Sequence, residues 1–114
     1  MPEFLERATD AVTAAVPGIR PVPFGHMGDG NIHFNLSQPP GSDASIFLAR
    51  APEIHVLVHA IVAEMGGSVS AEHGIGRNKR PYLRLSRTEP ELALMGTIKS
   101  ALDPAGILNP RRVL

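Results

Sequence analysis

The 114-residue chain contains no cysteine and no tryptophan, and Tyr82 is its single tyrosine. The absence of cysteine excludes disulfides, thiolate metal ligands and cysteine nucleophiles. Lysine plus arginine equals aspartate plus glutamate at 11 each, and no basic run is present to neutralise phosphates, so we do not expect a nucleic-acid partner. Aromatic residues make up only 4% of the chain, so an aromatic stacking platform is not expected either.

Long apolar runs are also missing from the chain. No run approaches the ~20 residues of a membrane-spanning helix, and the first residues, MPEFLERATD, carry acids where a signal peptide carries bases. The length suits a single domain. We therefore expect a soluble, cytoplasmic protein of one domain.

Helical and extended patterns alternate along the sequence. Apolar residues recur at helical spacing from Glu3 to Val16 and again from Pro52 to Met65, and a capping box at Thr88 predicts a third helix that ends near Leu102. Residues 19–36 read as a β-hairpin and residues 68–70 as a short strand, whereas residues 43–50 fit either a helical turn or irregular chain. The predicted fold class is α+β, an antiparallel sheet with helices packed on one face.

The hairpin contains two histidines that could hold a metal. Asp29-Gly30 is a dipeptide favoured by two-residue type I′ turns, and such a loop places His26 directly opposite His33. Opposed side chains share a face with Cβ atoms about 4.5–5.5 Å apart, so both imidazoles could reach one ion. Asn31 and Asn35 would lie on that face as well. The alternative is a cross-strand histidine pair in a half-buried sheet, without a metal.

A second cluster, Glu72-His73, favours the metal interpretation. Two histidines leave a metal under-coordinated, and Glu72 is the best candidate for a third ligand. Such a set leaves one position open for water or substrate, as in catalytic zinc sites. Glu72 and His73 can face one site only if the backbone bends, which Gly74 and Gly76 permit. The nearby Lys79 and Arg80 could hold a substrate carboxylate, although a solvated basic turn is the alternative.

Three segments together resemble the C-terminal domain of the FAD-linked oxidase family: GHMGDGNIHFN, SAEHGIG about forty residues later, and DPAGILNP near the end. That family includes D-lactate dehydrogenases, the flavin subunit of glycolate oxidase and D-2-hydroxyglutarate dehydrogenases. The resemblance implies that residues 1–114 form a partial cap domain for substrate and metal, and that FAD is bound mainly by another domain. It also implies oxidation of a D-2-hydroxyacid to a 2-oxoacid, with a divalent metal, zinc by preference, and hydride transfer to the flavin.

The resemblance assigns roles to seven residues of this chain. The matches are His26, His33 and Glu72 for the metal ligands, His73 for the catalytic base, Asn35 for a substrate contact, and Asn31 and Asn109 for positions near the flavin. One departure is visible: the family commonly ends Asn-Pro-Gly-Lys, whereas Arg111 and Arg112 follow Asn109-Pro110 here. The geometry of the last turn is therefore open.

The expected partners follow from this resemblance. They are a small 2-hydroxyacid, an FAD-binding domain, an electron acceptor that the sequence does not name, and a possible second copy of the chain. Without a flavin domain, we expect the chain to be inactive alone. Two alternatives stay open: a free-standing zinc hydrolase that uses a metal-bound water, and a non-catalytic oligomerising fragment.

Overall fold

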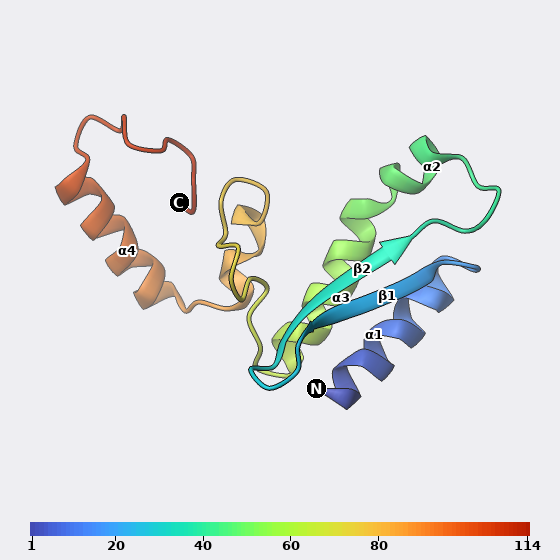
Figure 1. The fold of residues 1–114 in the computed structure, drawn as a ribbon. Coiled ribbons are helices and arrows are strands. Elements are labelled where there is room, and N and C mark those ends of the chain that lie inside the picture. The colour runs from blue at the N-terminus through green and yellow to red at the C-terminus, as the bar shows by residue number, and fades with distance from the viewer. The chain divides into compact units, whose positions relative to one another are not determined.

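The computed structural model describes residues 1–114, which form two compact units, Met1–Met65 and Gly66–Leu114, called unit 1 and unit 2 below. Unit 1 holds α1, β1, β2, α2 and α3, and unit 2 holds a 3₁₀ helix, η1, and α4 (Figure 1). Their bounds are α1 Pro2–Ala15, β1 Arg20–His26, β2 Asn31–Ser37, α2 Ala44–Ala49, α3 Ala51–Glu64, η1 Arg80–Leu85 and α4 Glu89–Leu102. None of the helices is both long and apolar enough to cross a membrane.

The core of unit 1 lies between the hairpin and two helices. Figure 1 shows α1 and α3 side by side, and Val12 of α1 packs with Ile54 of α3 and with Ile19 just before β1. Phe34 and Leu36 of β2 add their side chains to this cluster. These two residues alternate with the polar residues of β2, so one face of the sheet is covered by helices and the other is not. The predicted α+β class, with helices on one face of an antiparallel sheet, is confirmed.

The predicted hairpin is present, but its register is wrong in the prediction. β1 and β2 pair antiparallel with His26 opposite Asn31 and Phe24 opposite His33, so His26 and His33 do not face each other directly. The loop has four residues, Met27–Gly30, rather than two. The physical reason lies at Asp29, because a type I′ turn requires positive φ at both central residues. Only Gly30 has one, at +70°.

The backbone of the loop forms two overlapping turns instead. The amide of Asp29 donates to the carbonyl of His26 at 3.1 Å, and the amide of Gly30 donates to that of Met27 at 3.4 Å. Four-residue hairpin loops are most often built around turns of this kind, with right-handed helical residues followed by a left-handed one. The residue of β1 opposite Asn31 is therefore His26, two residues before Gly28, which a two-residue loop would place there.

Capping residues explain where the helices begin. The Glu91 carboxylate accepts from the backbone amide of Thr88 at 2.7 Å, which completes the capping box predicted for α4. Asp43 caps α2 with its own side chain, which accepts from the amide of Ser45 at 2.8 Å and from that of Ile46 at 3.1 Å. Within residues 43–50, which the sequence left undecided, Ala44–Ala49 are thus helical because Asp43 satisfies the first amides.

The short strand predicted at residues 68–70 is absent, and η1 was not predicted. Ser68 bonds locally instead, because its hydroxyl donates to the carbonyl of Ser70 at 3.2 Å and accepts from the amide of the same residue at 3.4 Å. Serine side chains offer the backbone this alternative to a sheet ladder. The apolar Val69 between them is buried without belonging to a strand.

Candidate active site

The uncovered face of the hairpin carries four of the predicted site residues. Successive side chains of a strand alternate between faces, so Asn31, His33 and Asn35 of β2 lie together, with His26 on the same face of β1. His26 is paired with Asn31, and His33, two residues further along β2, is therefore the diagonal neighbour of His26. Diagonal positions are separated by about 7–8 Å between Cα atoms, which long side chains still bridge. The histidines keep their common face although the direct opposition is lost.

Phe24 is a member of this face that the sequence did not single out. Its ring stacks on the imidazole of His33 with centroids 4.9 Å apart and planes 18° apart. The signal was present, because Phe24 lies two residues before His26 and a strand repeats every two residues. Stacking restricts the rotation of the His33 ring, so Phe24 helps to fix the direction in which that imidazole presents its nitrogens.

Asp29 brings a carboxylate close to His26, the other histidine of this face. Its Oδ2 lies 3.9 Å from Nδ1 of His26, which is too far for a direct hydrogen bond. The negative charge nevertheless lies on the Nδ1 side of the ring and leaves Nε2 available to a ligand. A carboxylate near the second nitrogen is the usual surrounding of a metal-binding histidine.

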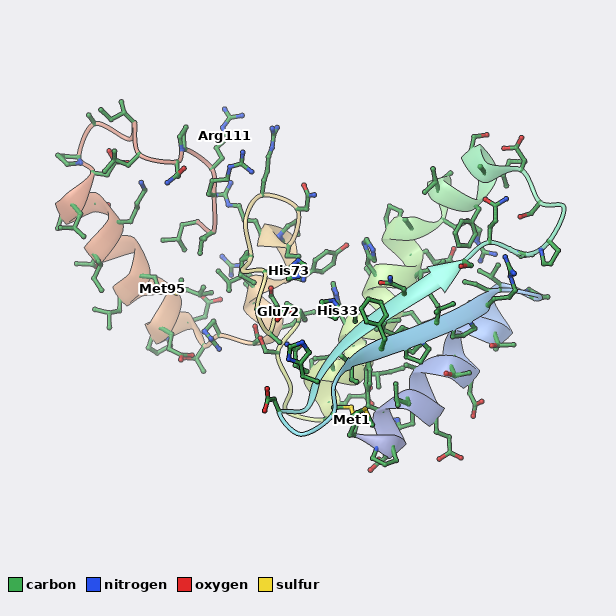
Figure 2. The ribbon with its side chains drawn as sticks, viewed as in Figure 1. Met1, His33, Glu72, His73, Met95 and Arg111 are labelled. Atoms are coloured by element: carbon green, nitrogen blue, oxygen red, sulfur yellow. The ribbon has the colours of Figure 1, made fainter.

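Glu72 and His73 lie together in unit 2, on the segment after α3, as Figure 2 shows. The chain bends over residues 71–73, and Gly74 continues it with a φ of +72°. The bend lets neighbouring side chains meet, and Oε1 of Glu72 lies 3.5 Å from Nε2 of His73. The backbone bend that the sequence analysis required is therefore present, and it leads directly into Gly74 with its left-handed backbone.

A hollow of about 260 Å³ lies beside His73. Its walls are formed by residues 73–79 and by Arg112 from the C-terminal tail. Lys79 is half-buried there, and its ammonium donates to the hydroxyl of Ser70 at 3.4 Å. Arg80, which the sequence offered together with Lys79 as a carboxylate holder, starts η1 and does not line the hollow. Of the predicted pair, only Lys79 lies next to the candidate base.

The tail of unit 2 folds back onto this loop. The amide of Val113 donates to the carbonyl of Gly76 at 2.9 Å. Three residues of the tail have positive φ, namely Asn109 at 46°, Arg111 at 59° and Val113 at 67°. Arg111 stands where the related terminal motif has glycine, and its left-handed backbone is the conformation that glycine adopts without strain.

The donor set fits a divalent metal by its chemistry. Two imidazoles share the hairpin face in unit 1, and a carboxylate lies beside a third imidazole in unit 2. Neutral imidazole and carboxylate are the ligands that zinc and similar ions accept. Of the predicted ligands, His26 and His33 belong to unit 1 and Glu72 belongs to unit 2.

The family described as "FAD linked oxidases, C-terminal domain" matches residues 1–113. The chain belongs to this family. Among curated members, the D-2-hydroxyglutarate dehydrogenase of Stutzerimonas stutzeri (strain A1501) is 38% identical over 113 residues. That of Xanthomonas citri pv. viticola is 40% identical over 113 residues, and the mitochondrial D-2-hydroxyglutarate dehydrogenase of Danio rerio is 44% identical over 93 residues.

The matched FAD-linked oxidases are much longer than this chain. The two bacterial matches cover 99% of the chain but 24% of each relative, and the Danio rerio match covers 82% of the chain and 16% of the relative. The chain therefore spans a quarter or less of the length of these relatives.

Proposed function

We propose that this chain is the substrate- and metal-binding part of an FAD-dependent dehydrogenase that oxidises a D-2-hydroxyacid to a 2-oxoacid. The family match over residues 1–113 carries the proposal. D-2-hydroxyglutarate is the first substrate to test, because the relatives described above are named for it. The same match favours this proposal over a free-standing zinc hydrolase, because no hydrolase is named among those relatives.

The chain's residues divide the work between binding and proton transfer. His26, His33 and Glu72 would hold the metal, which supplies Lewis acidity toward the hydroxyl and carboxylate of the substrate. His73 would accept the hydroxyl proton on an imidazole nitrogen, and the 3.5 Å separation from Glu72 keeps that ring beside a metal ligand. Bound FAD would accept the hydride from the substrate carbon, which balances the two-electron oxidation.

The asparagines would position the reactants. Asn35 shares the hairpin face with His33 and could donate its amide hydrogens to a substrate carboxylate. Asn31 lies on the same face, opposite His26, and Asn109 lies in the tail of unit 2 with a left-handed backbone. By the resemblance, both would face the flavin.

The experiment is a chimera in which this chain replaces the corresponding C-terminal part of the Stutzerimonas stutzeri enzyme. The readout is anaerobic bleaching of the flavin by D-2-hydroxyglutarate, D-lactate or glycolate. We expect bleaching by at least one of the three, and a loss of about 100-fold or more in its rate in His73→Asn, as for other lost general bases. A chimera that retains FAD and the native fold but is bleached by no 2-hydroxyacid would contradict the proposal.

Metal binding has its own readout. Elemental analysis and calorimetric titration with Zn²⁺ should show about one ion per chimera, and His33→Ala and Glu72→Gln should each weaken its binding strongly. His55→Ala on α3 is the matched control, because it removes an imidazole from outside the predicted ligand set. Equal zinc affinity in all three variants would refute the ligand assignment without affecting the flavin result.

A further inference from the structure

The loop that carries Glu72 and His73 is closed by a serine side chain. The hydroxyl of Ser70 donates to the carbonyl oxygen of Gly74 at 2.7 Å, so the bond spans both residues of the candidate site. Figure 2 shows Glu72 and His73 on this loop, and both residues are exposed. Because exposed side chains are held by little packing, their placement depends on the backbone between Ser70 and Gly74.

Lys79 fixes the direction of the Ser70 hydroxyl. Its ammonium lies 3.4 Å from the same hydroxyl oxygen. An ammonium only donates, whereas a hydroxyl has one hydrogen to give and lone pairs that accept, so the hydrogen of Ser70 is left for Gly74. The positive charge also polarises the hydroxyl and strengthens its bond to the carbonyl. The contact with Lys79 is the longer of the two, so the lysine orients the hydroxyl and the serine holds the loop.

The segment on either side of this bond is attached to ordered chain. Val69, which precedes Ser70, is 8% exposed and belongs to the small apolar core of unit 2. The carbonyl of Gly76 accepts from the amide of Val113 at 2.9 Å. Between these points the chain passes through two left-handed glycines, Gly74 at +72° and Gly76 at +55°. Glycine leaves the backbone unusually free, so a single loop conformation requires a bond such as that of Ser70.

We propose that Ser70 is a positioning residue for the candidate active site. Its bond to the loop holds Glu72 and His73 side by side, so that the ligand and the base keep their 3.5 Å separation. Lys79 acts through Ser70 by orienting the hydroxyl. This role differs from the contact with a substrate carboxylate that the sequence suggested for the same lysine. The inference rests on the proposed function, because that function makes Glu72 a ligand and His73 the base.

The first test measures the loop itself in the purified chain, without substrate or metal. Ser70→Ala removes the hydroxyl, and Ser86→Ala is the matched control, because Ser86 also donates to a carbonyl of unit 2, that of Leu83 at 3.4 Å. We expect backbone order parameters of His73 and Gly74, from amide-nitrogen spin relaxation, of about 0.85 in the parent and below about 0.6 in Ser70→Ala. Low values in the parent, or unchanged values in Ser70→Ala, would overturn the inference.

The second test measures flavin bleaching in the chimera with the Stutzerimonas stutzeri flavin portion at saturating Zn²⁺. The substrate is whichever of D-2-hydroxyglutarate, D-lactate and glycolate bleaches the parent. We expect Ser70→Ala to lower the limiting rate about tenfold and to change the substrate affinity less than about threefold, because a displaced base slows proton transfer without removing a substrate contact. Ser70→Thr, which retains a hydroxyl, should recover most of the rate, and Ser86→Ala should keep it. An unchanged limiting rate in Ser70→Ala, or an equal loss in Ser70→Thr, would overturn the positioning role.

A double-mutant cycle separates the two roles of Lys79. If the lysine acts through Ser70, Lys79→Met should lower the limiting rate about threefold, and the double variant with Ser70→Ala should be no slower than Ser70→Ala alone. A Lys79→Met protein that binds substrate about tenfold more weakly, with effects that multiply in the double variant, would identify a substrate contact. That result would overturn the route through Ser70.

The two proposals can fail separately. A parent chimera that no 2-hydroxyacid bleaches would refute the proposed activity, whereas the order parameters of the purified chain would still decide whether Ser70 holds the loop. Bleaching of the Ser70→Ala chimera at the parent rate would overturn the positioning role and leave the proposed function intact.

Discussion

Unit 1 and unit 2 are each stabilised from within, but by different kinds of contact. Six of the eight buried apolar residues belong to unit 1, where Val12 is fully buried and Ile54 is 3% exposed. Unit 2 contributes only Val69 and Leu83 to that set. Its order depends on local polar bonds instead, such as the capping box of α4 and the bonds to Asp103. One unit is stabilised by a core, and the other by hydrogen bonds that fix turns and leave apolar side chains outside.

The largest effect is expected from the core of unit 1. Ile54→Ala removes buried methyl and methylene groups from the cluster with Val12, and such truncations lower the free energy of unfolding by about 2–5 kcal/mol. Urea unfolding of the purified chain, followed by far-ultraviolet circular dichroism, measures the change. Val56→Ala, on the exposed side of the same helix, should stay within about 0.5 kcal/mol. Similar losses in the two variants would mean that unit 1 has no core of the kind described.

A smaller loss is expected at Gly25 in β1. A Cβ atom there would lie 2.4 Å from the carbonyl oxygen of Asn31, and the φ of +150° belongs to a region that side chains avoid. We expect Gly25→Ala to cost about 1–3 kcal/mol from the backbone conformation alone and to loosen the pairing of Phe24 with His33. Nuclear Overhauser contacts between those two rings report the pairing. Gly28→Ala is the control, because a Cβ atom there meets open space; equal losses would contradict the steric explanation.

The tail of unit 2 should respond to acid through Asp103. The Lys99 ammonium, together with the amides of Leu108 and Ile107, lowers the pKa of the Asp103 carboxyl below its usual value. A lowered folded-state pKa stabilises the tail fully above the unfolded value of about 3.9, and the contribution is lost as pH falls through the folded value. Amide exchange at Ile107 and Leu108, corrected for its intrinsic pH dependence, should therefore lose protection in that acidic window.

Asp103→Asn should produce the same loss of protection at neutral pH, because the neutral amide cannot pair with Lys99 as an ion. Asp10→Asn on α1 is the control and should leave both amides unaffected. A tail that keeps its protection in Asp103→Asn would show that unit 2 is held by something other than these bonds.

The smallest effect is expected at Arg111. A left-handed backbone costs a residue other than glycine about 1–2 kcal/mol, so Arg111→Gly should relieve strain. Glycine also gains about 0.4–1 kcal/mol of freedom in the unfolded chain, which opposes the gain. We expect a net stabilisation below about 1 kcal/mol, measured as a shift of the thermal midpoint. A destabilised Arg111→Gly would mean that the guanidinium makes contacts that matter more than the backbone strain.

The sequence predicted the elements well wherever local chemistry decides them. The apolar period of α1, the Pro52 start of α3 and the capping box at Thr88 each depend on neighbours within four residues, and all three predictions are confirmed. The common face of His26 and His33 was also predicted, because it depends only on the alternation of a strand.

The predictions from the sequence were wrong where several local signals compete. The dipeptide Asp29-Gly30 indicated a two-residue loop, but Asp29 does not adopt the positive φ that such a loop needs, and the loop takes four residues. Ser68-Val69-Ser70 looked extended, yet the hydroxyl of Ser68 bonds the backbone of Ser70. The stacking of Phe24 on His33 depends on the register, which the turn sets, so the wrong turn concealed it.

The four-residue loop at Met27–Gly30 also sets a rule for how the hairpin can change. Side chains repeat every two residues, so the difference of two between the predicted and observed pairing left every residue on its own face. A shift of the pairing by one residue would instead oblige one strand to turn over, either sending His33 toward the helices or bringing Phe34 out of the core. Changes in this loop should therefore keep the predicted metal ligands on one face only where they leave the pairing unchanged or shift it by an even number of residues.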